Sequence, residues 1–167
     1  GHLEYPPSYN AWLYRRKGAA LRSALRGRAV NSALDIGSGT GWVVRQLLDR
    51  GAGSVVGVEL TQVAVDRLRL EFPALSFHQL DVGVAPLPAQ AASIDTVTML
   101  DVAYHLVEDS GLDHVLAEIA RVLRLGGVAI VTDQFGTRDH PAADHVRFRS
   151  QQLLQRRSPI ALADRAV

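Results

Sequence analysis

Hydrophobic and polar positions follow two different patterns along the chain, and together these patterns predict strands that alternate with helices. Short apolar runs predict buried strands over residues 32–37, 54–60, 75–81, 94–102 and 127–133. Between these runs, apolar residues recur at spacings of three and four, which predicts amphipathic helices. Because each strand is apolar on both faces, we expect an α/β fold: a doubly wound, mainly parallel sheet flanked by helices.

Polar residues and glycines mark where these helices begin and end. Thr61 is suited to cap the helix after the second strand, and Asp109 or Ser110 to cap the helix after the fourth. The Gly126–Gly127 pair is expected to end the latter helix. Ahead of the first strand, an apolar row over residues 10–26 predicts a long N-terminal helix.

The last 34 residues follow neither of these two patterns clearly. A helix is expected around Arg149–Arg156, and no strand is evident in residues 134–167. We interpret the chain as one domain with three parts: an N-terminal helical segment (1–30), a core of strands and helices (31–133) and a C-terminal segment of loop and helix (134–167).

Composition narrows the class of protein. With 167 residues, 47% hydrophobic and 21% charged, the chain can build the core of a globular domain. It has no cysteine, which excludes thiolate metal sites and cysteine nucleophiles. The histidines and acids near residues 139–145 are interpreted as surface pairs, so no metal is expected. Without an evident leader or membrane-spanning run, we expect a cytoplasmic protein and no membrane partner.

Charge is unevenly distributed although the net charge is only +1. Residues 1–34 hold six basic residues and one acidic residue, whereas residues 35–133 hold six basic and thirteen acidic residues. The longest basic run has only three residues, Arg15–Lys17. This argues against a nucleic-acid partner and favours solvated, arginine-rich helix faces.

A glycine-rich turn follows the first strand in ALDIGSGTGW, where Gly37, Gly39 and Gly41 stand at alternate positions. In an open parallel sheet, ligands bind beyond the carboxyl ends of the strands, and glycine lets a ligand approach the backbone closely. The dinucleotide fingerprint needs a glycine where this chain has Trp42, and no lysine follows as in a Walker motif. A nucleoside without phosphates therefore fits the turn better than a pyrophosphate.

Carboxylates near three strand ends indicate that such a nucleoside is positively charged. Glu59 can accept hydrogen bonds from both ribose hydroxyls, and Asp81 can accept from an adenine amino group beside the backbone N–H of Val82. Asp35, just before the turn, can orient the loop or accept from an ammonium group. These carboxylates suit a cationic ligand without phosphates, and S-adenosyl-L-methionine has both a sulfonium and an ammonium group.

These segments together resemble the class I S-adenosylmethionine-dependent methyltransferases. The resemblance covers residues 32–133 and rests on ALDIGSGTG, VVGVEL, HQLDV, IDTVTMLDVAYHL and LAEIARVLRLGGVAIVTD, in the family's order. It implies a Rossmann-like fold, S-adenosylmethionine as methyl donor and S-adenosyl-L-homocysteine as product. It also implies cofactor contacts from the glycine turn with Ser38 and from the strand ends: Glu59, Leu60, Asp81, Val82, Leu100 and Asp101.

The sequence departs from the family pattern after the fifth strand. The family completes a seven-stranded sheet with a strand hairpin, and residues 134–167 lack strand character. We therefore expect the C-terminal strand pair to be absent or incomplete, which makes an inactive cofactor-binding module the main alternative to an enzyme. An NAD(P)-dependent oxidoreductase is a weaker alternative, because the residue four positions after Tyr104 is Glu108 rather than lysine.

Candidates for handling the methyl acceptor follow the fourth strand and lie near the N-terminus. Methyl transfer from a sulfonium depends mainly on alignment, and His105 is the best candidate for a base where the acceptor is a hydroxyl or ammonium group. Tyr104 either packs beside it or shapes the acceptor site. Tyr9 and Trp12 are expected to form a lid that excludes water.

The acceptor expected from the sequence is a small molecule that is methylated on oxygen or nitrogen. Enzymes that methylate amide or exocyclic base nitrogens often carry an Asn/Asp-Pro-Pro-aromatic signature where this chain has LDVAYHL. Arg147 or Arg149 is a candidate for binding an acidic group of the acceptor.

Overall fold

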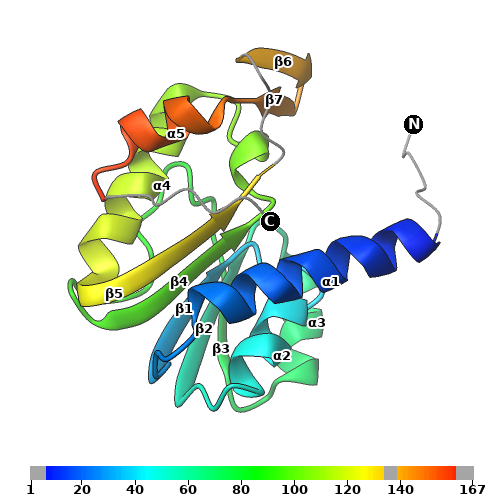
Figure 1. Ribbon diagram of the computed structural model, residues 1–167, viewed down its shortest axis with the longest axis vertical. Helices are drawn as coiled ribbons and strands as arrows, with labels where there is room; N and C mark the ends of the chain where they lie inside the picture. The colour runs from blue at the N-terminus through cyan, green and yellow to red at the C-terminus, as the bar shows by residue number, and fades with distance from the viewer. Residues whose placement is uncertain (1–6, 134–138, 161–167) are drawn as a thin grey trace. The chain divides into compact units, whose positions relative to one another are not determined.

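The computed structural model describes residues 7–133 and 139–160, and the chain divides into two compact units. The larger unit comprises residues 30–162. The described part of the smaller unit is residues 7–29, which consist of helix α1 (Pro7–Ala24) and the turn after it (Figure 1). The predicted N-terminal helix is thus present and begins at a proline, which is tolerated in the first helical turn.

Five parallel strands form the main sheet of the larger unit, in the order β3-β2-β1-β4-β5. Their bounds are Ser32–Ile36 for β1, Ser54–Glu59 for β2, Ser76–Gln79 for β3, Ile94–Leu100 for β4 and Leu123–Thr132 for β5. Strand β1 is central, and the chain leaves it on one side towards β2 and β3 and on the other towards β4 and β5. The carboxyl end of β1 is therefore the point at which a ligand-binding crevice is expected.

Helices cover both faces of this sheet (Figure 1). Helices α2 (Trp42–Leu48) and α3 (Gln62–Glu71) lie on one face, and α4 (Asp109–Val122) lies on the other, with α5 (Gln151–Arg157) on the same side as α4. The α/β class and the mainly parallel, helix-flanked sheet predicted from the sequence are confirmed.

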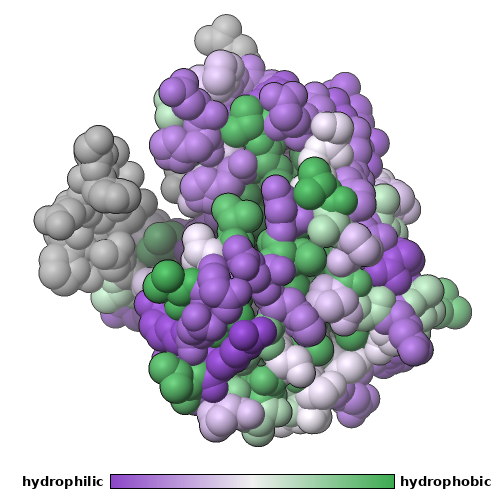
Figure 2. Space-filling model, turned by 180° about the vertical axis from the view of Figure 1, so that it is seen from behind, coloured by the Kyte–Doolittle hydropathy of each residue, from purple (hydrophilic) through white to green (hydrophobic). Residues whose placement is uncertain are grey.

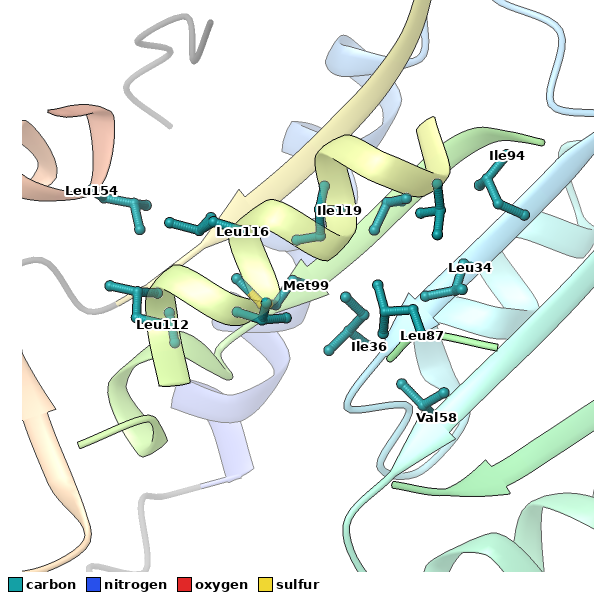
Figure 3. Packing of buried hydrophobic residues seen from close by; sticks show 14 residues of the cluster. Leu34, Ile36, Val58, Leu87, Ile94, Met99, Leu112, Leu116, Ile119 and Leu154 are labelled. Atoms are coloured by element: carbon teal, nitrogen blue, oxygen red, sulfur yellow. The ribbon is translucent and has the colours of Figure 1, made fainter. Parts of the chain in front are cut away.

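The apolar core of the larger unit fills the space between α4 and the sheet (Figure 3). Leu34 and Ile36 of β1 meet Met99 of β4 and Ile119 of α4 there, and all four are at most 1% exposed. Because side chains alternate along a strand, Asp35 between the two β1 residues points to the opposite face, towards the layer of α2 and α3.

The junction of α4 and β5 differs from the prediction. The helix ends at Val122 and the strand begins at the next residue, so the Gly126–Gly127 pair lies inside β5 rather than at the end of a helix. The pairing with β4 shifts register between Ile94 and Thr96, and Gly126 has a φ of 78°. The two glycines form an irregularity in the strand, where a residue with positive φ is needed.

The two capping predictions have different outcomes. Thr61 caps α3, because its side chain accepts a hydrogen bond from the backbone N–H of Ala64 at 3.4 Å. Neither Asp109 nor Ser110 caps α4, which begins at Asp109 itself and follows Glu108. The Asp109 carboxylate instead bonds to arginines that come much later in the chain.

Residues 139–160 contain strands that the sequence did not reveal. Strands β6 (His140–Ala143) and β7 (Val146–Phe148) pair with each other in antiparallel fashion and form a separate two-stranded sheet. Within the described residues, therefore, no reversed strand joins the main sheet. Short strands that are exposed or half-buried carry no apolar run, which explains why they escaped detection. The helix expected around residues 149–156 is present as α5.

The surface of the larger unit exposes apolar side chains singly. On the face seen in Figure 2, hydrophobic residues are scattered among hydrophilic ones. Among the described residues of this unit, the large hydrophobic side chains that are exposed are Leu60, Val63, Leu70, Val84 and Leu125. Along the described stretches of chain, no helix is long and apolar enough to cross a membrane.

Candidate functional site

The carboxyl ends of four parallel strands bring the predicted cofactor residues to one edge of the sheet (Figure 1). The glycine turn follows β1, Glu59 ends β2, Asp81 comes two residues after β3, and Leu100 ends β4. Parallel pairing in register places these ends side by side. The structure therefore assembles one candidate site from segments that are far apart in the sequence.

Glu59 is bonded to the glycine turn through the backbone. Its Oε1 accepts a hydrogen bond from Gly39 N at 3.1 Å, and its Oε2 accepts one from Leu60 N at 2.6 Å. From α3, Arg67 donates to the carbonyl oxygen of Gly39 at 2.7 Å. Each carboxylate oxygen can accept more than one hydrogen bond, so Glu59 retains acceptor capacity for the hydroxyls of a ribose.

Two of the three glycines in the turn are required by packing rather than by a ligand. A Cβ on Gly37 would lie 2.4 Å from Cγ2 of Val102, and a Cβ on Gly41 would lie 2.6 Å from the ring of Phe72. A Cβ on Gly39 would meet only the carbonyl oxygen of Gly37, at 3.7 Å. All three have positive φ. The interpretation that glycine allows close approach of a ligand thus applies best to Gly39.

Asp35 is buried beneath the turn with one carboxyl oxygen satisfied. Its Oδ1 accepts a hydrogen bond from the Thr98 hydroxyl at 2.6 Å, and the two residues are register partners in β1 and β4. The Ser38 hydroxyl donates to the backbone oxygen of Asp35 at 3.1 Å. Asp35 Oδ2 is buried and has no hydrogen-bond partner among the described residues.

Burial controls the ionisation of Asp35. Loss of solvent raises the pKa of its carboxyl from 3.8 to about 7, and the negative charge of Glu59 adds a smaller increase. The hydrogen bond from Thr98, followed by the nearby hydroxyl of Ser38, lowers the pKa but does not cancel this increase. Asp35 thus changes protonation near neutral pH, and its role in orienting the loop stays a prediction.

The ends of β3 and β4 carry two further carboxylates. Asp81 accepts a hydrogen bond from Gly83 N at 2.9 Å, which closes a tight turn that contains Val82. Asp101, directly after Leu100, has a φ of 58° and accepts a hydrogen bond from the Thr132 hydroxyl at 3.1 Å. A positive φ in a residue other than glycine is uncommon, and here it redirects the chain away from β4.

A short helix, η1 (Ala103–His105), holds the residues expected to handle the acceptor. The Tyr104 ring lies 4.2 Å from the His105 ring and 6.2 Å from the Phe148 ring of β7, measured between centroids. His105 is exposed, and its Nδ1 lies 3.3 Å from the backbone oxygen of His145. Burial, followed by the negative charges of Asp101 and Asp133, raises the pKa of Tyr104, so its phenol stays protonated. The Tyr104 ring therefore packs between its neighbour His105 and Phe148 of β7.

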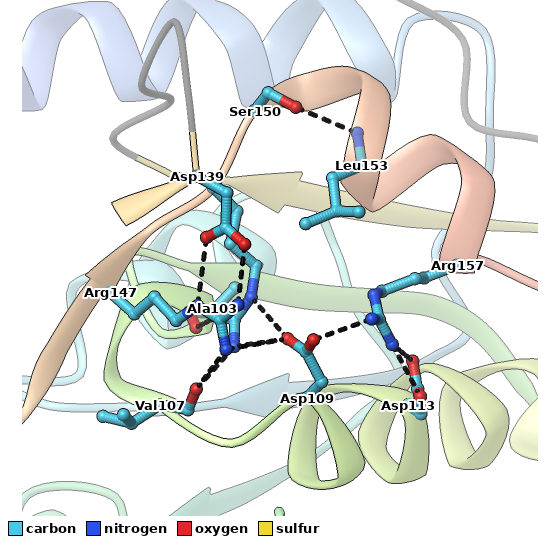
Figure 4. Close-up of polar contacts among 10 residues, drawn as sticks. Ala103, Val107, Asp109, Asp113, Asp139, Arg147, Ser150, Leu153 and Arg157 are labelled. Atoms are coloured by element: carbon cyan, nitrogen blue, oxygen red, sulfur yellow. Dashed lines mark hydrogen bonds and ion pairs between the residues drawn. The ribbon is translucent and has the colours of Figure 1, made fainter. Parts of the chain in front are cut away.

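The two arginines considered for an acidic acceptor already have partners, and Figure 4 shows those of Arg147. Arg149 is 3% exposed and bonds to Asp109, and Arg147 bonds to Asp139 at 2.6 Å and to Asp109 at 3.2 Å. The hydrogen bond from Arg147 holds the pKa of the Asp139 carboxyl below its usual value. The prediction that Arg149 binds an acceptor is wrong, because this guanidinium is buried in a structural contact.

The lid residues lie in α1, within the smaller unit. The Trp12 side chain is 44% exposed, and the guanidinium of Arg16 stands 5.1 Å from the centre of its rings. The backbone of Tyr9 belongs to the helix, but its side chain lies outside the part that the structure describes. The lid stays a prediction.

The residues at the strand ends fit S-adenosylmethionine. Glu59, Asp81 and Asp101 supply carboxylate acceptors, and the buried Oδ2 of Asp35 has no donor within residues 7–133 and 139–160. The turn has an open backbone approach at Gly39. A phosphate-bearing ligand would meet these negative charges, whereas a cationic nucleoside is favoured by them.

The sequence analysis did not identify the residues that contact the candidate site residues and hold the neighbouring segments in place. Thr98 was detectable, because the polar residues of TVTML alternate with apolar ones and align with Asp35 across the sheet. Val102, which packs against Gly37, gave no signal because one valine among many carries no information about its partner. Arg149 and Asp109 are separated by 40 positions, and their pairing depends on the tertiary fold.

Comparisons with known proteins agree with this geometry. A family described as a methyltransferase domain matches residues 33–127. Among curated proteins, the tRNA U34 carboxymethyltransferase of Methylococcus capsulatus is 31% identical over 127 residues, 72% of this chain and 37% of that protein. The protein of the same name from Pseudomonas aeruginosa is 37% identical over 113 residues, 64% of this chain and 32% of that protein. The chain thus spans about a third of the length of these curated relatives.

Solved structures share the fold. The YcgJ protein of Bacillus subtilis has a TM-score of 0.71 and 21% identity over 86% of this chain and 66% of that chain. The N-methyltransferase NodS of Bradyrhizobium japonicum, solved with S-adenosyl-L-homocysteine, has a TM-score of 0.63 and 18% identity over 77% of this chain and 63% of that chain.

One prediction is contradicted by these comparisons. The sequence pointed to a small-molecule acceptor and argued against nucleic acid, but the curated relatives are named for a tRNA substrate. The argument failed because it weighed only the length of basic runs and the absence of a signature for amino nitrogens.

With its glycine turn, acidic strand ends and parallel sheet in the predicted order, and with residues 33–127 matching the methyltransferase domain family, the chain belongs to the class I S-adenosylmethionine-dependent methyltransferases that its motifs resemble.

Proposed function

We propose that this chain transfers the methyl group of S-adenosylmethionine to a uridine of a tRNA. The curated relatives that carry a tRNA uridine in their names support the class of acceptor. These relatives match 64% to 72% of this chain, so the proposal concerns the segment that they share with it. A cytoplasmic location, expected from the sequence, agrees with such a substrate.

The observation that carries the proposal is the bond between Glu59 and Gly39. It fixes a carboxylate next to the one position in the glycine turn where a Cβ would meet only a single backbone oxygen at 3.7 Å. When bound, S-adenosylmethionine supplies an electrophilic methyl carbon on a sulfonium, which leaves as a neutral thioether without protonation. The residues of the chain therefore have to hold the donor and align the acceptor, which can supply most of the catalysis.

A uridine acceptor accords with the segment after β4. Uracil has no exocyclic amino group, so an enzyme that modifies it has no need of the signature for amide or amino nitrogens that LDVAYHL replaces. An exposed imidazole at His105 is available to accept a proton from the acceptor.

We favour a methyl group over a carboxymethyl group, although the relatives are named for the latter. A carboxylate added to the donor would face Glu59, Asp81 and Asp101 at the strand ends. The arginines beside η1 already pair with Asp109 and Asp139. Like charges at short range disfavour the bulkier, negatively charged donor.

A transfer assay tests the proposal. The full chain is incubated with S-adenosylmethionine labelled in the methyl group, together with unmodified tRNA and, in parallel, a mixture of small metabolites. Nucleoside analysis that finds the label in a modified uridine supports the proposal. Label found only in metabolites, or binding of S-adenosylmethionine without transfer to any acceptor, contradicts it; the second result identifies an inactive binding module.

A pair of glutamate variants links the assay to the site. Glu59→Gln should weaken S-adenosylmethionine binding and transfer together, because an amide has one acceptor oxygen where the carboxylate uses two. Glu71→Gln is the matched control, because Glu71 lies on α3 and pairs with Arg45 at the surface. Equal effects of the two substitutions would argue against the placement of the cofactor.

A further inference from the structure

We propose that the exposed face of α1, continued by the turn after it, binds the phosphate backbone of the RNA acceptor. The inference rests on the proposed function, since it names the surface that holds the proposed acceptor. It concerns the smaller unit alone, whose described residues are 7–29.

The charged residues of this segment are all basic. Residues 7–28 contain six basic residues and no acidic residue, although the whole chain has nearly equal numbers of both kinds. The basic residues are Arg15, Arg16, Lys17, Arg22, Arg26 and Arg28. A phosphate backbone is the commonest partner of such a stripe, because each phosphate that a basic residue neutralises releases a counterion.

Helical spacing gathers several of these residues in one row. Arg15, Ala19, Arg22 and Arg26 stand at i, i+4, i+7 and i+11, and all four are exposed. The backbone N–H of Arg26 donates to Ser23 O at 3.4 Å, which continues the turn past the last helical residue. Position 19, between Arg15 and Arg22 of this row, carries only an exposed alanine.

These arginines differ from those of the larger unit in their partners. Among the described residues, Arg15, Arg16, Arg22 and Arg26 form no ion pair with an acid. In the larger unit, most arginines are paired, as in Arg45–Glu71, Arg69–Asp66, Arg121–Glu118, Arg124–Asp95, Arg149–Asp109 and Arg157–Asp113. A phosphate can therefore approach the α1 row without displacing a carboxylate.

An aromatic residue lies next to the row. Trp12 is 44% exposed, and Arg16 one turn later covers its ring at 5.1 Å. Single-stranded RNA bases stack on exposed aromatic rings and on arginine planes. A tRNA loop offers both unstacked bases and phosphates, so this pairing of charge and ring suits it.

A membrane surface fits the same helix less well. Membrane-bound amphipathic helices insert a face of large apolar residues. Here the leucines Leu21 and Leu25 are each 1% exposed, so they offer no apolar row to lipid. Over residues 11–26, the exposed face carries arginines and alanine beside the rings of Trp12 and Tyr14, with no aliphatic row, which favours a soluble polyanion.

The test compares two variants of the full chain that lose the same charge. Arg15, Arg22 and Arg26 are replaced together by glutamine in one variant, and Arg45, Arg50 and Arg156 of the larger unit in the other. Binding of unmodified tRNA is measured by fluorescence anisotropy over a range of salt concentrations. We expect the α1 variant to bind about tenfold or more weakly, with a slope of log K against log salt that is smaller by about 2 to 3. The control variant should stay within about twofold to threefold of the original protein.

The outcomes separate this inference from the proposed function. If the original protein methylates and binds tRNA while both variants bind equally well or lose equally, the proposed function stands and the α1 surface is wrong. If the original protein neither binds nor methylates tRNA, the proposed function fails and the inference with it. Binding to vesicles of phosphatidylglycerol and phosphatidylcholine that is lost in the α1 variant, without any loss of tRNA binding, also overturns the inference.

The two tryptophans of the chain permit a second readout. Trp42→Phe leaves Trp12 as the sole indole, and we expect its fluorescence to fall as tRNA binds, with the midpoint seen by anisotropy. Unchanged fluorescence at saturating tRNA contradicts base stacking at this ring. A change on adding S-adenosylmethionine alone would instead favour the lid that the sequence predicted.

Discussion

The guanidinium of Arg149 donates two hydrogen bonds to one oxygen of Asp109, from Nε at 3.2 Å and from Nη2 at 3.1 Å. The same group bonds to the backbone oxygens of Ala103 at 3.3 Å and Val107 at 2.9 Å. Arg149 follows β7 directly, and it is 3% exposed. One side chain therefore joins the β6–β7 sheet to η1 and to the first turn of α4.

Replacing Arg149 should destabilise the fold more than its loss of charge implies. Arg149→Met removes the side-chain donor to the backbone oxygen of Ala103, one of two donors to that of Val107 and one of the three arginines at the Asp109 carboxylate, so we expect the free energy of unfolding to fall by about 1 to 3 kcal/mol. Urea unfolding measures this value. Arg156→Met, on the exposed side of α5, is the matched control and should change it by less than about 0.5 kcal/mol. Equal effects would mean that the buried contact contributes nothing beyond surface charge.

The ionisation of Asp35 should make the stability of the protein depend on pH. Because burial raises its pKa from 3.8 to about 7 in the folded state, the folded chain holds a proton between these values that the unfolded chain releases. The contribution of this residue to the free energy of unfolding is full below pH 4 and falls as the pH rises towards 7. The loss is on the order of 2 to 4 kcal/mol.

Asp35→Asn isolates this contribution. The amide oxygen can still accept from Thr98 but does not titrate, so the variant should show a flatter stability curve between pH 4 and pH 8. Relative to the original protein it should be stabilised at pH 8. Parallel curves for the two proteins, measured by thermal or urea unfolding, would show that Asp35 ionises as it does in water.

The sequence predicted the strands that are buried along their length. It also predicted the part of the site whose residues stand close together in the chain. Five strands and the turn between β1 and α2 follow from apolar runs and glycine spacing, because a two-sided core leaves such a pattern. The β6–β7 pair left none, since its residues are exposed or half-buried.

Long-range contacts were beyond reach for a different reason. Val102 explains why position 37 must be glycine, yet its contact with Gly37 depends on how β4 ends beside β1. The role of Asp109 was mistaken for a helix cap because its true partner lies 40 positions later. The sequence shows which residues are polar, whereas the fold decides which of them meet.

The three glycines of the turn should respond differently to alanine. Gly37→Ala forces a Cβ into Val102 and strains a φ of 73°, so we expect a loss of about 2 to 4 kcal/mol of stability. Gly39→Ala has open space and should cost only about 1 kcal/mol, but it should weaken S-adenosylmethionine binding by tenfold or more. Calorimetric titration beside thermal unfolding separates the two effects. A Gly39→Ala variant with unchanged affinity would show that the cofactor does not approach this position.

His105 should affect the transfer step rather than the binding of the cofactor. When its Nδ1–H donates to the backbone oxygen of His145, which lies 3.3 Å away, the Nε2 lone pair is available to accept a proton from the acceptor. His105→Ala should then lower kcat for tRNA methylation by about 100-fold or more and leave the Kd of S-adenosylmethionine unchanged. His78→Ala, at an exposed position of β3, is the control and should alter neither value. A rise in KM with kcat unchanged would assign His105 to acceptor binding, and normal turnover would remove it from the site.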